Sequence, residues 1–542
     1  MENFKFAALL LVLAATFSLL SCSDDDDKGK GEEKIVNIDD LLKEVDPTVQ
    51  VESEGVGNVL DDYRELIKQA SGSNDDEEKA NLEFYKQRLA EYEAYCEHKS
   101  DSVKEANPEA YQHALDSLNA IDPSNSLVAG IGQIFGTYGW VTLTYMDEGA
   151  DGKMRKMSTL AIYPRNAFCD LNADHVILCP HWTIASDEER PTNYSEATGA
   201  FGFKSKNPNV MAGEWAAFDE YLVIMPDYEG YGESVDVAHP YLMREVQARQ
   251  CIMSLLMGID WFTASPSEWG GGGHDENIDD DYKIVIEGYS QGGAVSAATY
   301  RYYLEHKNEA WAKNLPVAGC VCGDGPHDPF ATLQYYCKRN YVEMPVAPAM
   351  VLKGLLDYDP EMKAAKCEMK DFCSQGFIDS GIFDAIASKK YDTDGCSDFV
   401  FKYAKEHPDI IKLNEGKLPA DQMLTPAAYN YFATGKLIKG ANYQKLALLK
   451  KCLQKNSIAY NFTPPSDAHF TFFHSVADAV VPYDNYESMK AAWGTSRLYG
   501  VTYKGDEKSH TGVGTAFFKS HHSDLVQDIL DGDWKSGEKT VD

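Results

Sequence analysis

The chain has 542 residues, of which 44% are hydrophobic and 12% aromatic, so it can bury a large core and is not disordered as a whole. Its 50 Lys and Arg against 85 Asp and Glu give a formal net charge of −35 at pH 7. A chain so negative gains nothing from approaching nucleic acid or an anionic membrane surface, and we therefore expect neither as a partner.

Residues 1–22 have the pattern of an export signal. An apolar run over 6–20 is too short to cross a bilayer comfortably, and it ends at Leu19-Leu20-Ser21-Cys22, followed by a serine and four aspartates. This ending resembles a bacterial lipobox, in which the cysteine becomes the lipidated first residue of the mature protein. The resemblance implies a lipid on Cys22 and, by analogy with acidic export signals, an outer-membrane lipoprotein exposed on a Gram-negative cell surface. The alternative is a plain secretory signal in which Cys22 is incidental.

Two further segments precede the main domain. Residues 23–75 are polar and acid-rich with few aromatics, which predicts a loosely ordered acidic tether. Over 76–135, apolar residues recur at spacings of 3 or 4 between Leu82 and Cys96, and a second such stripe begins at Pro108. We expect an N-terminal helical extension packed on the main domain, in preference to a coiled-coil partner.

Strands and helices alternate from residue 136 onward. A hairpin is predicted where two strand-like segments flank Gly149 and Gly152. The predicted strands are 140–146, 154–163, 176–179, 221–225, 284–286, 317–322, 470–473 and 498–503, with helices over 245–262 and 515–530. Apolar strands joined through helices at these distances predict an α/β fold with a mostly parallel sheet, flanked by helices on both faces.

Residues 330–460 interrupt this alternation. They lack an evident strand and contain helical patches such as 443–453. We expect a helical cap inserted into the sheet domain, which it divides into a first part, 136–329, and a second part, 461–542. Four apolar side chains of the cap could line an acyl pocket, although core packing is the simpler interpretation: Phe372, Phe377, Ile378 and Phe383.

The turn Gly288-Tyr289-Ser290-Gln291-Gly292 joins a buried strand to an Ala-rich helix. A bare Gly-x-Ser-x-Gly pattern is weak evidence in a chain with 41 glycines, so the strand before it and the helix after it carry most of the signal. Such a turn is too sharp for side chains beside the serine, and it lifts the Ser290 hydroxyl out at the end of the sheet. A serine hydroxyl is a poor nucleophile at pH 7 and needs a base, which in turn needs an orienting acid.

Candidates for both partners follow in the chain. Asp478 comes after the 470–473 strand and His510 after the 498–503 strand, so both lie at the same sheet edge as Ser290. We predict Ser290 as nucleophile, Asp478 as acid and His510 as base. The rival residues are His474 as base and Asp484 as acid, Asp467 and His469 at the opposite edge, Asp227 and Tyr228 as pocket residues, and His521 and His522 as solvated histidines.

Four motifs in order resemble the α/β-hydrolase superfamily, and within it most of all the secretory lipase-type esterases. They are GYSQGG at Gly288, PDYEGYGES at Pro226 followed by HPYL at His239, HSVADAVVP at His474, and the late His510. The resemblance covers 139–530 without the cap. It implies the α/β-hydrolase fold and the same three roles for Ser290, Asp478 and His510.

The resemblance also implies an oxyanion hole. The family has His-Gly-Thr after the strand that corresponds to 176–179, whereas this chain has His181-Trp182-Thr183. We expect the backbone N–H of Trp182 or Thr183, together with that of Gln291, to bind the oxyanion.

These features predict a carboxylic ester hydrolase that works through an acyl-enzyme on a small-molecule or polymer-linked ester. No cysteine pair has the spacing of a zinc site, and we expect neither a metal nor an organic cofactor. Cys367 and Cys373 are close enough in sequence to form a disulfide, which the sequence does not decide. Two alternatives stay open: a serine peptidase of the same fold, and a surface binding lipoprotein without catalysis.

Overall fold

The computed structural model describes residues 49–73, 76–109, 111–112, 135–165, 172–194, 209–264, 277–436 and 442–542. In this part of the chain ten strands form a single sheet, in the order β1-β2-β3-β5-β4-β6-β7-β8-β9-β10. The strands are β1 (Gln50–Asn58), β2 (Thr137–Glu148), β3 (Met154–Pro164), β4 (His175–Leu178), β5 (Tyr221–Pro226), β6 (Ile284–Tyr289), β7 (Val317–Gly323), β8 (Phe470–Ser475), β9 (Tyr499–Tyr503) and β10 (Gly537–Val541).

The sheet is mostly parallel. The pairs from β5 to β10 are all parallel, whereas β1, β2, β3 and β5 pair antiparallel, with β2 and β3 forming the predicted hairpin. Strand β6 lies between β4 and β7, and its Ile284, Val285 and Ile286 are fully buried. Both faces of β6 are covered, which is why its sequence is a continuous apolar run without alternation.

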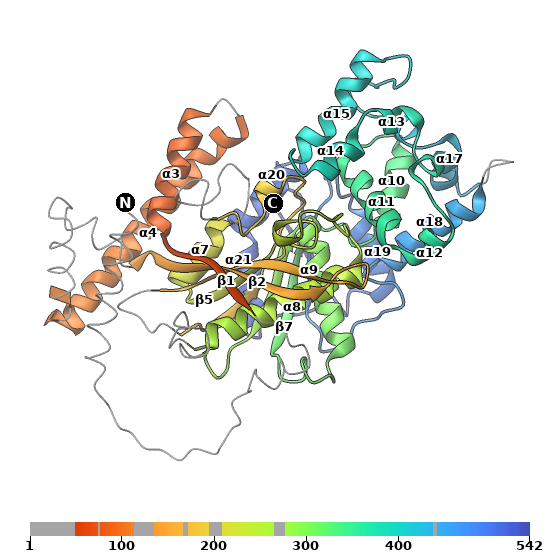
Figure 1. Ribbon diagram of the computed structural model, residues 1–542. Helices are drawn as coiled ribbons and strands as arrows, with labels where there is room; N and C mark the ends of the chain where they lie inside the picture. The colour runs from red at the N-terminus through yellow and green to blue at the C-terminus, as the bar shows by residue number, and fades with distance from the viewer. Residues whose placement is uncertain are drawn as a thin grey trace.

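Helices cover both faces of the sheet (Figure 1). One face packs against α8 (Arg244–Thr263), α9 (Gln291–His306) and α19 (Asp484–Trp493). The other packs against α3 (Val59–Gly72), α7 (Asn209–Phe218), α20 (His510–Ser520) and α21 (His522–Leu530). Helix α4 (Asp76–Ala106) packs on α3 and contributes Tyr85, Leu89 and Tyr92 to that second layer.

A helical region between β7 and β8 forms the cap. Figure 1 shows its helices gathered at one side of the sheet, away from α3 and α4. The cap has its own hydrophobic core, which contains Phe372, Phe377 and Phe432. Its helices are α10 (Pro329–Arg339), α11 (Val346–Tyr358), α12 (Pro360–Ala364), α13 (Gln375–Asp379), α14 (Ile382–Ser388), α15 (Thr393–Glu406), α16 (Ala420–Met423), α17 (Pro426–Thr434) and α18 (Tyr443–Lys455).

The prediction of an acidic tether over 23–75 is wrong from Gln50 onward. Residues 50–58 form β1, which pairs with β2, and α3 follows with Asn58 as its N-cap, accepting a hydrogen bond from the Leu60 amide. Helix α3 buries Tyr63 and Leu66 against the sheet, whereas Asp61, Arg64 and Lys68 are exposed on its outer face. Composition alone hides this amphipathic pattern. Residues 23–48 and the lipobox at Cys22 lie outside the described residues, as does most of the second stripe after Pro108.

The C-terminal region also differs from prediction. The single helix predicted over 515–530 is two helices, because the backbone leaves the helical conformation at His521 between α20 and α21. Strand β10 was not predicted. It adds an edge strand parallel to β9, and its residues are half-buried or exposed, so it lacks the apolar pattern of the inner strands.

Candidate active site

Ser290 occupies the sharp turn between β6 and α9. Its backbone has φ 58° and ψ −123°, a strained conformation for a residue with a side chain. The glycine positions around it are crowded: a Cβ at Gly292 would lie 2.1 Å from the Pro180 carbonyl oxygen, and one at Gly288 would lie 2.6 Å from the Gly292 carbonyl carbon. The turn therefore requires glycine on both sides of Ser290, as the sequence pattern predicts.

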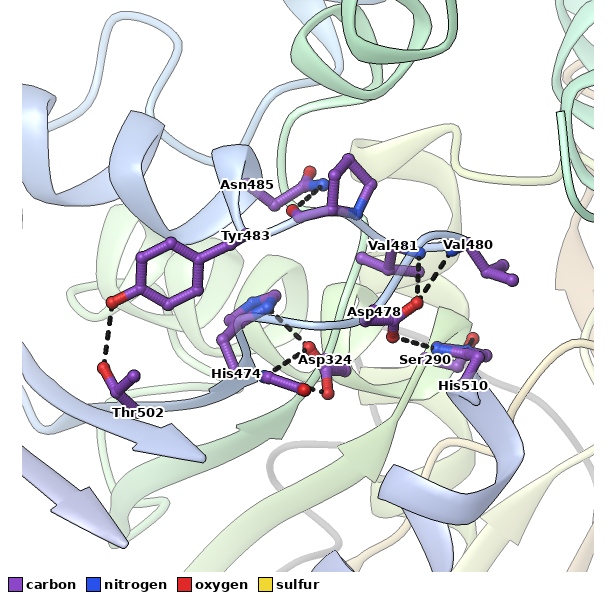
Figure 2. A network of polar contacts seen from close by, with 12 residues as sticks. Ser290, Asp324, His474, Asp478, Val480, Val481, Tyr483, Asn485, Thr502 and His510 are labelled. Carbon is purple, nitrogen blue, oxygen red and sulfur yellow. Dashed lines mark hydrogen bonds and ion pairs between the residues drawn. The ribbon is translucent and has the colours of Figure 1, made fainter. Parts of the chain in front are cut away.

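The structure brings Ser290, His510 and Asp478 into one hydrogen-bonded row (Figure 2). His510 Nε2 lies 2.7 Å from Ser290 Oγ, and His510 Nδ1 lies 2.5 Å from Asp478 Oδ2. Because the Asp478 carboxylate accepts a hydrogen bond from the ring Nδ1–H, the tautomer it favours leaves Nε2 unprotonated and able to accept the proton of the serine hydroxyl. All three side chains are buried or nearly so.

Separate elements fix the two partners of Ser290. The Asp478 carboxylate accepts backbone hydrogen bonds from Val480 at 2.8 Å and Val481 at 3.0 Å. His510 is the first residue of α20, which begins there because the Ser509 side chain caps it by accepting from the Gly512 amide. The Tyr289 hydroxyl donates to the His510 carbonyl at 2.6 Å, so the residue before Ser290 also holds the histidine.

The charge of Asp478 sets the protonation of His510. Burial of the imidazole lowers its pKa, but the nearby Asp478 carboxylate and its hydrogen bond outweigh burial and leave the His510 pKa above its usual value. His510 is therefore ready to hold a proton taken from the serine.

A second carboxyl, Asp324, follows β7 at the same edge of the sheet. It accepts from the Ser475 amide at 3.1 Å, and its Oδ1 lies 2.8 Å from His474 Nδ1 (Figure 2). Burial, and then the charge of Asp478, raises the pKa of Asp324 well above its usual range, while burial lowers the pKa of His474 to about 3. His474 is therefore neutral at pH 7, and it contacts Asp324 instead of Ser290. Sequence reasoning missed Asp324, although its place directly after a strand was the available signal.

The predicted oxyanion loop lies against the first turn of α9, where backbone N–H groups have no acceptor inside the helix. A Cβ added at Gly292 would lie 3.0 Å from the carbonyl group of His181, so the loop and the helix are in close contact. Gln291 is the first residue of α9 and follows Ser290 directly. Thr183 lines the same cavity as Ser290, whereas the Trp182 ring packs near Phe518, with 6.0 Å between the ring centroids.

Two motifs from the sequence fix this loop. After β5, the Tyr228 hydroxyl donates to the His181 carbonyl at 3.0 Å and the Tyr231 hydroxyl to the Ile184 carbonyl at 2.6 Å. In the HPYL motif, the Tyr241 hydroxyl lies 2.7 Å from the Thr183 hydroxyl.

The HPYL motif also positions Gln291. His239 Nδ1 donates to the Glu229 carbonyl at 2.7 Å, which leaves Nε2 to accept from the Gln291 side-chain amide at 2.7 Å. The role of His239 was not predicted, because neither contact is local in sequence.

A cavity opens from Ser290 into the cap. It has about 860 Å³, including the open space at its mouth. Among the described residues its lining includes no Asp, Glu, Lys or Arg, and its polar groups are hydroxyls such as those of Thr183 and Tyr241. Of the four cap residues that the sequence suggested for an acyl pocket, Phe372 and Phe377 line the cavity, whereas Ile378 and Phe383 pack in the cap core.

The rival residues lie elsewhere. Asp484 is exposed at the start of α19, and Asp467 is exposed before β8, where it pairs with Lys307 at 3.7 Å. The expectation of a solvated His522 is wrong: the ring is buried and lies 2.9 Å from Glu287 on β6. His521 is half-buried.

Cys367 and Cys373 are both free thiols. Within the described ranges no group of three or more His, Cys, Asp or Glu side chains is placed to hold a metal ion.

Solved structures of similar shape define the fold. A scan against models of protein families finds no match, and a search of curated proteins finds none either. A Legionella pneumophila protein provisionally described as a hydrolase aligns with a TM-score of 0.54 and 16% identity, over 72% of this chain and 89% of that one. The rice cell wall degrading esterase LipA from Xanthomonas oryzae aligns with a TM-score of 0.52 and 16% identity, over 77% and 95%. The chain thus has the predicted α/β-hydrolase fold.

Proposed function

We propose that the protein is a serine hydrolase of carboxylic esters. The observation that carries the proposal is the contact between Ser290 Oγ and His510 Nε2, 2.7 Å apart, beside an apolar cavity. The fold shared with a cell wall degrading esterase supports the same class of reaction. Fold alone does not imply activity, so the hydrogen-bonded arrangement of Ser290, His510 and Asp478 carries more weight than the structural similarity to an esterase.

In the proposed reaction, Ser290 Oγ attacks the ester carbonyl while its proton passes to His510 Nε2. Asp478 stabilises the imidazolium that forms, and the backbone N–H groups of Gln291 and of Trp182 or Thr183 bind the oxyanion. His510 then gives its proton to the departing alcohol, leaving an acyl group on Ser290. Water, activated by His510, releases the acid and restores the enzyme.

The cavity supports an ester substrate whose acyl group is apolar. A lining without charged side chains favours burial of a hydrocarbon and penalises an ionised group. The alcohol part, whether a small molecule or a polymer, would lie toward the open mouth. Hydrolysis by this row of residues requires neither metal nor organic cofactor.

The test compares two serines of the same helical region. Ser290→Ala should abolish hydrolysis of p-nitrophenyl butyrate and leave the melting temperature within a few degrees of the wild type. Ser296→Ala is the matched control, because Ser296 is buried in α9 and its hydroxyl has no hydrogen-bond partner among the described residues. Full turnover in Ser290→Ala, or its loss in both variants, would contradict the proposal.

We further propose that the enzyme is an outer-membrane lipoprotein anchored through Cys22 and exposed at the cell surface. The lipobox-like sequence and the four aspartates after it support this placement. Among the described residues, none of the helices is long and apolar enough to span a bilayer.

A further inference from the structure

A second pocket lies between the core and the cap, apart from the cavity at Ser290. It has about 530 Å³ with the open space at its mouth included. The segment 235–239 of the core forms one wall, and Met350 and Lys353 of α11 with Lys389 after α14 form the other. Helix α11 thus contributes to both pockets.

Lys389 is the unusual residue of this pocket. Lysine side chains normally carry their ammonium into water, yet Lys389 is only 6% exposed. Its backbone is fixed, since its carbonyl accepts from the Asp187 amide at 2.9 Å. The ammonium lies 4.3 Å from the centroid of the buried Tyr231 ring, a cation–π contact.

The Lys389 ammonium has no carboxylate within 4 Å among the described residues. The other lysine of the pocket, Lys353, is already paired with Asp357 at 2.8 Å. Burial and the charge of Lys353 lower the pKa of Lys389 to about 8, although the negative charges of Asp187 and Asp357 raise it in part. At pH 7 Lys389 is therefore mostly a buried cation without an anion, an arrangement that costs free energy until a counter-charge arrives.

We propose that this pocket binds a carboxylate, whose oxygens pair with the Lys389 ammonium. One unpaired cation matches a singly charged anion. No arginine lines the pocket, and Asp236 stands among its lining residues, so a doubly charged phosphate or sulfate finds too few donors. The pocket shares His239, which positions Gln291, with the active site, but Ser290, Asp478, His510 and the oxyanion donors do not line it, so carboxylate binding does not require the proposed esterase activity.

Two sources could supply the carboxylate: a free carboxylic acid, such as a hydrolysis product, or a uronic acid unit of a glycan. The pocket has room for a sugar ring. Sodium butyrate and sodium galacturonate represent the two sources, with neutral galactose as the control for the ring.

The experiment titrates each probe into the full-length protein by calorimetry at pH 7 and constant ionic strength. We expect saturable binding of galacturonate, butyrate or both, no binding of galactose, and at least a tenfold loss of affinity in Lys389→Met. Lys390→Met is the matched control, since Lys390 is the next residue and exposed, and it should bind like the wild type. Binding of galacturonate alone identifies a uronate, and equal binding of butyrate identifies a free carboxylate.

A second measurement does not depend on a variant. Reductive methylation followed by peptide mass spectrometry should show Lys389 protected several-fold by the bound carboxylate, with Lys390 modified at an unchanged rate. Absence of binding by both carboxylates, binding unaffected by Lys389→Met, or saturation by phosphate or sulfate in their place would overturn the proposal.

Discussion

At the scale of single residues, the site depends on close backbone packing as much as on its three polar side chains. Gly292 lets the first turn of α9 approach Pro180 and His181, the start of the loop that carries Trp182 and Thr183. The sequence predicted Ser290, Asp478 and His510 because each follows an apolar strand at one sheet edge. The position of Asp324 directly after β7 was a signal that it lies at the same edge, but its contact with Ser475 and that of His239 with Gln291 join residues far apart in the chain and could not be predicted.

Gly292→Ala should impair hydrolysis. Its Cβ would lie 2.1 Å from the Pro180 carbonyl oxygen, so the oxyanion loop must shift away from Ser290. We expect kcat/KM for p-nitrophenyl butyrate to fall at least a hundredfold, the order lost when one oxyanion donor is removed. Gly72→Ala is the control, because a Cβ there meets nothing within 4 Å, and it should keep full activity. Equal activity in the two variants would count against the proposed oxyanion loop.

The pH dependence of hydrolysis should report His510. Only the neutral imidazole can accept the serine proton, so activity falls as the pH drops through the His510 pKa. Because the Asp478 carboxylate raises this pKa, the acid limb of kcat/KM should have its midpoint above about 6.5, the ordinary histidine value.

Asp478→Asn removes that charge and favours the wrong tautomer. Its acid limb should move to lower pH, and kcat should fall by roughly 10⁴, as in serine hydrolases whose acid is replaced by its amide. Asp484→Asn, at the exposed rival acid, should change neither quantity. A wild-type rate and an unmoved midpoint in Asp478→Asn would exclude Asp478 as the acid.

At the scale of elements, the inner strands were predictable and the edge strands were not. Strands β4 to β9 are short apolar runs, the signature of a sheet covered on both faces. Strand β1 reads QVESEGVGN and is largely exposed or half-buried, so its sequence resembles that of a polar linker. The cap was recognisable by its lack of strands, but the cavity it forms with Ser290 depends on tertiary packing that no local pattern encodes.

Filling the cavity should change acyl-chain preference. Ala347 on α11 lines the cavity and is half-buried, so a larger side chain there enters the cavity without overpacking a core. Ala347→Trp should lower kcat/KM for p-nitrophenyl decanoate at least tenfold and leave the acetate ester within about twofold. Ala364→Trp, exposed on α12, should affect neither ester. Parallel losses for all chain lengths would show that the acyl group lies elsewhere.

At the scale of the whole molecule, the sheet extends through β1 with α3 and α4 on one face, and the cap helices gather in a separate layer away from α3 and α4 (Figure 1). The α/β-hydrolase fold was predictable because four motifs in order constrain topology more than any one of them. The chain before Gln50, including the lipobox, stays a prediction from sequence.

Cys22→Ala should prevent anchoring. Without the lipid-bearing thiol the protein should move from the membrane fraction to the soluble fraction after cell lysis. Cys96→Ala is the control, since Cys96 is a buried free thiol, and that variant should stay with the membrane. Membrane association that survives the loss of Cys22 would refute the lipoprotein assignment.

The central claim is that Ser290 is a nucleophile activated by His510. Treating the protein with a fluorophosphonate and locating the adduct by peptide mass spectrometry tests it most directly. We predict near-stoichiometric modification of Ser290, at a rate that falls at least a thousandfold in His510→Ala. An unmodified Ser290 in the folded wild-type protein would contradict the claim and favour a binding protein that keeps the fold without the chemistry.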